Sequence, residues 1–289
     1  MKILLLGIFF ICLNTFTGST FDTITKYSGT NNYMWYHYYA IGGTVAIFSL
    51  LLLLFFQGKF QENIILKKKK YYYLPVFRGV YFISVLIIAF YSLKYVPINI
   101  FTMLLMTTPF FLLIFAKFIL KEKLNFISWI AILIGFCGVL IVLRPSTYNI
   151  DIYILLVLFV AISNAFNFTL VSKYSHIATT YGFTFYQYIP LTIFSCIFFI
   201  YDPILPTLKE FTLFASSGLI LMISMWAFNS AYHIAGKYSS VISSFMFTQI
   251  IWGSFYGIIF FSEKINSISI FGFLVIIVSG SIAIYNRNK

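Results

Sequence analysis

The residues of this chain that could do chemistry are a few acidic, basic and amide side chains set inside long apolar runs. Asp22 and Lys26 lie four residues apart near the end of the first run, and His37 opens the second run. A charge near the centre of a bilayer costs roughly 2.5–3.5 kcal/mol, so such residues are candidates for function. Asp22 could face a cavity and bind a cation or a proton, or it could pair with Lys26 on one helix face at the membrane surface. His37 could line an outer vestibule or belong to a belt of tyrosines.

A second set consists of amides and tryptophans in the second half of the chain. Asn164 and Asn167 are three residues apart, and the same spacing separates other members of the set. Amides in membrane helices can hold helices together, with roughly 0.6–2 kcal/mol each. Together these residues could instead line a polar cavity that stacks a planar ligand. The set comprises Asn164, Asn167, Gln187, Trp226, Asn229, Gln249 and Trp252. Arg78 is expected to extend to the inner surface, with a gating role as the alternative.

Several catalytic and cofactor motifs are absent from the sequence. There is no GxxxxGK[ST], HExxH or GxSxG pattern, so a direct role for ATP or a known hydrolytic site is not predicted. Three histidines without helical ligand spacing predict no metal site, and we expect no cofactor. The three cysteines lie in apolar runs and show no disulfide pattern. A binding protein is therefore favoured over an enzyme.

The composition determines which elements must position these residues. Of 289 residues, 61% are hydrophobic and 9% are charged, with a mean hydropathy of +0.95. Soluble domains have about 25% charged residues, so this is a polytopic membrane protein. The runs are continuously apolar rather than alternating, which favours helices over a barrel. We predict ten spans, at residues 3–21, 33–57, 74–94, 97–119, 125–143, 150–172, 180–201, 211–232, 239–261 and 267–285.

The chain repeats itself. Glu122 to Asn125 and Glu263 to Asn266 share the pattern Glu-Lys-(Leu/Ile)-Asn between apolar runs, and FDTITKYS at Phe21 recurs as FTLVSKYS at Phe168. Two repeats are predicted, at residues 1–145 and 146–289. An odd number of spans in each repeat inverts one repeat relative to the other, as in transporters with a site between repeats. The match of the first run to an interior run argues against the alternative that it is a cleaved signal peptide.

The basic residues predict the orientation. With both termini in the cytoplasm, fourteen of the 19 Lys and Arg residues fall on the inner side and five on the outer side. The largest cluster lies between the second and third spans and is expected to contact anionic lipid head groups. It consists of Lys67, Lys68, Lys69 and Lys70. We see no indication of nucleic-acid binding in the +12 net charge, because the basic residues lie at span ends.

The order of several residues resembles the drug/metabolite transporter superfamily, in its EamA-type branch with two five-helix repeats. The residues that carry the resemblance are Arg78, Gly79, Tyr91 to Pro97, Pro109, Glu122, Gly135, Gly138, Arg144 and Pro145, echoed by Ala227, Gly253, Glu263 and Gly280. Within this branch, residues 77–145 resemble the S-adenosylmethionine uptake carriers of obligate intracellular bacteria. One departure is His37, where those carriers often have an arginine.

The resemblance implies a secondary carrier of the bacterial inner membrane that works by alternating access. Its substrate would be a small polar metabolite such as S-adenosylmethionine or an amino acid, with Asp22, Lys26, His37 and Arg78 as coupling or gating residues. The alternatives are an exporter of the same fold, a lipid-acting membrane enzyme and a channel-like protein. A homodimer is a further expectation.

Overall fold

The structure is a computed structural model that describes residues 2–31, 33–121, 126–143, 152–235 and 245–285. These ranges contain helices and no strand, as predicted for an all-α membrane protein. The elements are α1 (Lys2–Thr30), α2 (Trp35–Phe56), α3 (Phe60–Ile64), η1 (Lys69–Tyr71), α4 (Tyr73–Tyr95), α5 (Ile98–Leu105), α6 (Thr108–Ile119), α7 (Phe126–Leu143), α8 (Ile152–Lys173), α9 (Thr180–Tyr201), α10 (Leu208–Ala235), η3 (Phe245–Phe247), α12 (Thr248–Phe261) and α13 (Ser267–Tyr285).

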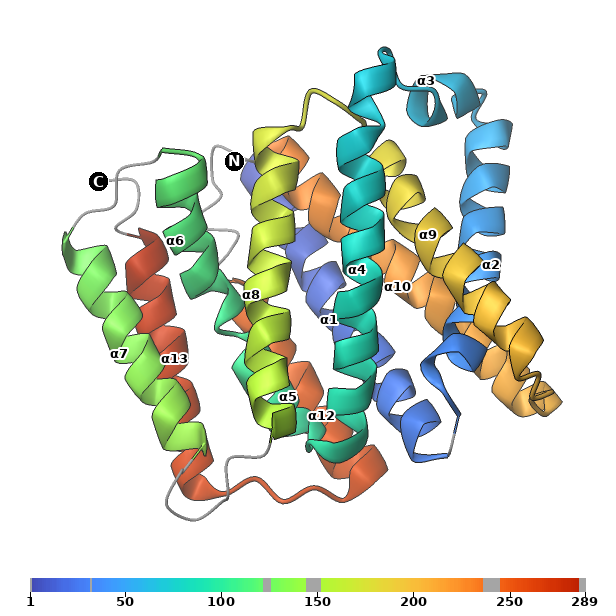
Figure 1. Ribbon diagram of the computed structural model, residues 1–289. Helices are drawn as coiled ribbons and strands as arrows, with labels where there is room; N and C mark the ends of the chain where they lie inside the picture. The colour runs from blue at the N-terminus through green and yellow to red at the C-terminus, as the bar shows by residue number, and fades with distance from the viewer. Residues whose placement is uncertain (1, 32, 122–125, 144–151, 236–244, 286–289) are drawn as a thin grey trace.

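The described residues contain apolar helices at each of the ten predicted spans. Among the described residues, seven are long and apolar enough to cross a bilayer, counting α5 and α6 together. Three shorter apolar helices occupy the fifth, ninth and tenth predicted spans, at Trp129–Gly138, Phe245–Phe261 and Ile270–Ile282. The helices alternate in direction, so α1 begins and α13 ends at the end of the molecule that carries α3 (Figure 1). The first-span prediction was too short, because α1 continues to Thr30.

The helix contacts have a two-fold pattern that relates the halves. The first and eighth spans, α1 and α10, pack together as do their counterparts α8 and α4. The contact of α2 with α10 is matched by that of α9 with α4. Counterparts also contact each other directly, in the pairs α2 with α9 and α7 with α13. Such a pattern is what an inverted pair of five-helix units produces.

The fourth span differs from the prediction, which gave one helix over residues 97–119. It is broken into α5 and α6 at Met106–Thr107, because Pro109 has no backbone N–H for the bond that would continue the helix. The ninth span changes from η3 to α12 at the matching place. Thr107 and Thr248 each lie 15 residues before the repeated glutamate, and each hydroxyl donates to the carbonyl three residues earlier, at 2.7 and 2.6 Å.

Polar residues are tolerated in α1 because their groups are paired inside the protein. The hydroxyls of Thr15, Thr23 and Ser28 donate to carbonyls three or four residues back in the same helix. Ser19 donates to the backbone carbonyl of Gln249 at 3.1 Å, which ties α1 to α12. These bonds allow a polar helix to lie at the centre of the molecule, where lipid offers no partners.

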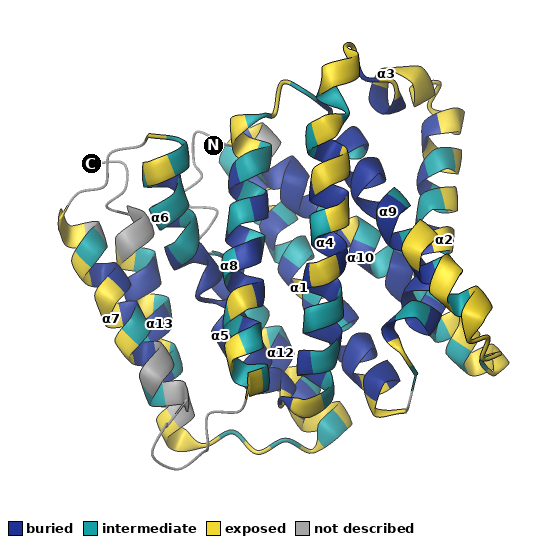
Figure 2. Ribbon diagram, in the orientation of Figure 1, coloured by how far each residue is buried: buried dark blue, intermediate teal, exposed yellow. Residues whose placement is uncertain are grey.

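The outward faces of the helices are apolar. Exposed residues run along the outer sides of α2, α7 and α9, and α4 also carries exposed residues between its buried ones (Figure 2). Phe56 and Tyr201 are among the exposed aromatic residues. Lys67 to Lys70, by contrast, are exposed at the α3 end of the molecule, and Lys68 Nζ lies 5.8 Å from the Tyr71 ring centroid. An apolar perimeter of this kind fits a bilayer.

The helices α2 and α10 cross at a contact that only glycine allows. A Cβ atom at Gly218 would overlap the backbone carbonyl of Gly42, and one at Gly42 would lie 2.9 Å from the carbonyl of Phe214. Backbone atoms cannot move aside as a side chain can. The crossing therefore depends on both glycines.

We expect Gly218→Ala to lower the free energy of unfolding by about 1–3 kcal/mol through overpacking at this crossing. The measurement is thermal unfolding of the purified protein in detergent. Gly29→Ala is the matched control, since a Cβ there would meet its nearest neighbour, Lys94 Cβ, at an ordinary 3.4 Å. Equal melting temperatures for both variants would contradict this account of the crossing.

Candidate functional site

A cavity of about 100 Å³ lies between helices from both halves of the chain. Its walls come from α1, α4, α5, α8, α10 and α12, with Tyr39 from α2 and Thr108 at the start of α6. The described polar residues that line it are Asn14, Thr25, Thr108, Asn164, Ser224 and Gln249, together with Asp22. The breaks in the fourth and ninth spans both lie at this cavity, at Met106 and Met246. Ligand sites at broken helices between repeats are characteristic of secondary transporters.

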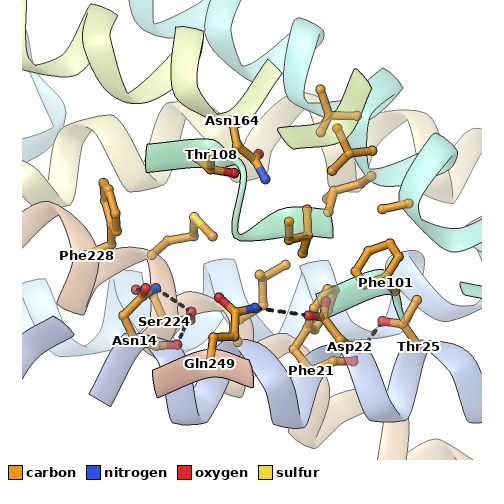
Figure 3. Close-up of a pocket in the computed structure, with 18 of the residues that line it drawn as sticks. Asn14, Phe21, Asp22, Thr25, Phe101, Thr108, Asn164, Ser224, Phe228 and Gln249 are labelled. Atoms are coloured by element: carbon orange, nitrogen blue, oxygen red, sulfur yellow. Dashed lines mark hydrogen bonds between the residues drawn. The ribbon is translucent and has the colours of Figure 1, made fainter. Parts of the chain in front are cut away.

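Asp22 is the one acidic residue in the described lining. Its Oδ2 accepts a hydrogen bond of 3.4 Å from Gln249 Nε2, so α1 and α12 meet here (Figure 3). Nearby, Asn14 Nδ2 donates to the hydroxyl and the carbonyl of Ser224 at 2.9 and 3.0 Å. Asn164 lies across the cavity from these groups (Figure 3). The arrangement provides a negative charge and several amides within an otherwise apolar chamber.

Aromatic rings and thioethers, together with aliphatic side chains, form the rest of the wall. Phe168 on α8 and Phe228 on α10 stack with their centroids 3.9 Å apart. The other members are Phe21, Tyr39, Phe82, Phe101, Met106, Met225 and Met246. Aromatic faces attract cations, and thioethers adapt their shape to a ligand. The cavity is therefore suited to a cationic or planar group.

Glu263 closes the end of the molecule opposite α3. Its Oε1 accepts from the backbone N–H of Ile98 at 2.7 Å, and its Oε2 accepts from that of Asn99 at 3.1 Å. These are the first N–H groups of α5, which have no partner within the helix, so Glu263 caps it from the other half. Lys26 Nζ lies 3.3 Å from Glu263 Oε1 and donates to the carbonyl of Val96 at 2.7 Å.

This arrangement decides between the two alternatives given for Asp22 and Lys26. Lys26 pairs with Glu263 rather than with Asp22, because the carboxylate of Glu263 is already held at the start of α5, beside Lys26. The side chain of Glu263 is only 10% exposed. Its counterpart in the repeat, Glu122, lies outside the described residues.

A second hollow lies at the α3 end of the molecule, with a volume of about 470 Å³. It is bounded by α1, α9, α10 and the segment that follows α2. Trp226 lines it rather than the central cavity, with its ring 6.4 Å from that of Tyr181 and 5.2 Å from that of Phe10. We call this hollow the inner vestibule, because the basic residues predict that the α3 end lies on the cytoplasmic side.

His37 lies away from the cavity, where α2 begins. Its Nδ1 accepts from the Met34 backbone N–H at 3.2 Å, so Nε2 carries the proton and donates to the Asp202 carbonyl at 2.7 Å. The ring is 1% exposed and joins the start of α2 to the end of α9. Both nitrogens are thus engaged in holding the fold.

The remaining predicted residues are divided between the cavity and other places. Gln187 and Asn229 are buried but do not line the cavity, and Gln187 Nε2 lies 4.0 Å from Met225 Sδ. Trp252 packs edge-on against Phe16, with centroids 5.1 Å apart, between α12 and α1. Asp22, Asn164 and Gln249 are the predicted residues that the cavity brings together.

Arg78 does not extend to the surface, which corrects a further expectation. It is 2% exposed, and its Nε donates to Asn167 Oδ1 at 2.8 Å. Helices α8 and α9 cover it, and its guanidinium carbon lies 5.0 Å from the Phe183 ring centroid. Arg78 is the sixth residue of α4, and the sequence around it does not show which other helices will cover it.

Sequence reasoning missed Asn14, Thr25, Thr108 and Ser224. A signal was present for the first, because Asn14, Gly18 and Asp22 follow each other at four-residue spacing and mark one face of α1. No comparable spacing singles out Ser224. It enters the cavity because α10 packs along α1.

Helices that span a membrane in two inverted halves, with a partly polar cavity between them, define the class of membrane transporters. Residues 5–144 match the family model described as "EamA-like transporter family". This confirms the resemblance seen in the sequence.

The chain is similar to relatives with named activities. It is 22% identical over 204 residues to the "Pseudopaline exporter CntI" of Pseudomonas aeruginosa, covering 70% of this chain and 71% of the exporter. It is 24% identical over 203 residues to the "S-adenosylmethionine uptake transporter" of Rickettsia bellii, covering 69% and 68%. The protein of the same name from Rickettsia prowazekii is also 24% identical.

The fold also matches a solved crystal structure. The TM-score is 0.68 at 12% sequence identity, and the match covers 100% of this chain and 99% of the other. This likeness shows the fold alone.

We expect Glu263→Gln to lower the free energy of unfolding by about 3–5 kcal/mol, because it leaves Lys26 buried without its counter-ion. Thermal unfolding in detergent measures the effect. The double variant Lys26→Met with Glu263→Gln should recover part of the loss, since it removes the uncompensated charge. If the double variant loses as much unfolding free energy as Lys26→Met and Glu263→Gln lose together, the ion pair has no coupling energy.

Proposed function

We propose that this protein is a secondary transporter of the bacterial inner membrane, with both termini in the cytoplasm. It moves a small polar metabolite of the S-adenosylmethionine or amino-acid type by alternating access between repeats 1–145 and 146–289. The observation that carries the proposal is the cavity between the two halves, with one carboxylate, Asp22, among amides and aromatic rings. A cation bound there would gain a charge partner and ring faces in a region of low dielectric.

The shape of the cavity supports a transport cycle with a moving part. A volume of about 100 Å³ leaves no room for a nucleoside-sized ligand, for which binding sites measure roughly 300–1,000 Å³. The Glu263–α5 contact closes one end, while the inner vestibule opens the other. In the proposed orientation the outer side is closed and the vestibule faces the cytoplasm. The exposed cluster Lys67–Lys70 then lies against the cytoplasmic leaflet, where anionic head groups would bind it.

An exporter of the same fold is the second candidate, favoured by the relative that is named as an exporter. Uptake and export share one cavity and differ in the gradient that drives them. Cells that express the protein separate them, since an importer raises the internal level of labelled substrate and an exporter lowers it in preloaded cells.

Proteoliposomes that contain the full chain should take up labelled S-adenosylmethionine in a saturable manner. Asp22→Asn should lower the uptake by roughly tenfold or more, because a charge-assisted contact to the cationic ligand is lost. Glu210→Gln is the matched control, as Glu210 is an acid in the first turn of α10, away from the cavity. No saturable uptake of S-adenosylmethionine or any amino acid by the unaltered protein would sink the proposed function.

If a proton drives uptake, Asp22 is the group that binds it, since it is the only titratable side chain in the described cavity wall apart from Tyr39. Asp22→Asn should then abolish the pH dependence of the residual uptake. His37→Gln should leave that dependence intact, because both ring nitrogens are engaged away from the cavity. Uptake measured from pH 5.5 to 8.0 in each variant tests this. The opposite pattern would assign coupling to His37.

A further inference from the structure

Arg78 and Asn167 each have a buried side-chain donor that forms no hydrogen bond with the described residues. Within the part of the chain that the structure describes, Arg78 Nη1 and Asn167 Nδ2 are both buried and have no hydrogen-bond partner. Arg78 is 2% exposed and Asn167 is 3% exposed. Buried polar groups are nearly always paired, and an unpaired one costs roughly 1–3 kcal/mol, more when it is charged.

The orientation of the Asn167 amide follows from its neighbour. A guanidinium can only donate hydrogen bonds, so the Asn167 atom that faces Arg78 Nε at 2.8 Å must be the carbonyl oxygen. The amide nitrogen therefore points to another side and needs an acceptor of its own. The unpaired side-chain atoms of Arg78 and Asn167 are thus both N–H donors.

The guanidinium also has no counter-ion among the described residues. Lys26 pairs with Glu263, the His37 ring contacts Asp202, and neither contact includes Arg78. Its charge is met by the amide oxygen of Asn167 and by the face of the Phe183 ring. A buried cation of this kind is unfavourable unless an anion joins it.

The pair lines neither hollow but lies on the same helices as residues that line the central cavity, and it contacts a residue close in sequence to the lining of the inner vestibule. Arg78 is four residues, or one helical turn, before the cavity residue Phe82 on α4. Asn167 directly precedes the cavity residue Phe168 on α8. Phe183 is three residues after Thr180, which lines the inner vestibule. A solute moving between the two hollows would pass this level.

We propose that Arg78 and Asn167 form an anion subsite that takes the carboxylate of the transported metabolite. A carboxylate has two oxygens and can accept from both residues at once, which a fixed guanidinium favours. The inference rests on the proposed transport function and deepens it. Asp22 serves the cationic end of the substrate and Arg78 the anionic end, so the substrate class is an amino-acid-like zwitterion.

Binding of labelled S-adenosylmethionine and of its decarboxylated analogue to the full chain in nanodiscs tests the subsite. The unaltered protein should bind the carboxylate form at least about tenfold more tightly. Arg78→Gln should remove this preference by weakening only the carboxylate form. Lys117→Gln, which removes another cation of the α3 end, should keep it. Two results would overturn the proposal. One is that the unaltered protein binds both ligands with equal affinity, as it would if an inorganic anion occupied the site. The other is that Arg78→Gln weakens the binding of both ligands equally.

Asn167→Asp gives a second measurement that needs no ligand. The new carboxylate would supply the missing counter-ion, so the melting temperature should rise while the preference for the carboxylate ligand disappears. If Asn167→Asp melts at a lower temperature than the unaltered protein, Arg78 does not lack a counter-ion. If the unaltered protein binds neither sulfonium compound, the S-adenosylmethionine assignment fails, and methionine against methioninamide tests the subsite in the same variants.

Discussion

The constraint on which the structure depends is that lipid offers no hydrogen-bond partners, so each polar group must be paired within the protein. The fold meets this demand unevenly. In α1 the hydroxyls return to their own backbone, and Glu263 supplies acceptors for the exposed start of α5. At Arg78 and Asn167 the pairing is incomplete. Pairing crosses from one half to the other in the cavity, between Gln249 and Asp22, and at the contact of Lys26 with Glu263.

Much of the fold follows from hydropathy and repetition alone. Continuous apolar runs predict ten helices, and the repeated Glu-Lys-(Leu/Ile)-Asn pattern predicts two inverted halves, because both signals are local. The break in the fourth span can also be predicted from the sequence, since Pro109 cannot continue a helix and Thr107 and Thr248 occupy equivalent positions. The extension of α1 to Thr30 is harder to predict. Its polar residues remain helical only because α4 and α10 cover them.

The site was predicted less completely, for a physical reason. Asp22, Asn164 and Gln249 were identified because a polar group in an apolar run is costly wherever it points. The partner of Lys26 was not, because Glu263 lies 237 positions further along the chain and only the tertiary fold brings it near. His37 and Arg78 show the same limit. Hydropathy places both near a membrane surface, and packing decides that His37 holds α2 to α9 while Arg78 is buried against Asn167 of α8.

The glycine crossing of α2 and α10 bears on how the halves can move. Backbone meets backbone there, with no side chain that could be compressed or turned aside. Sliding along this contact would drive a carbonyl of one helix into the chain of the other, whereas tilting about it keeps the distance unchanged. In the proposed transport cycle the crossing would act as a fulcrum, and the Lys26–Glu263 contact, made by other segments, would open or close with that tilt. Gly42 and Gly218 would then govern the rate of the transport cycle without touching any substrate.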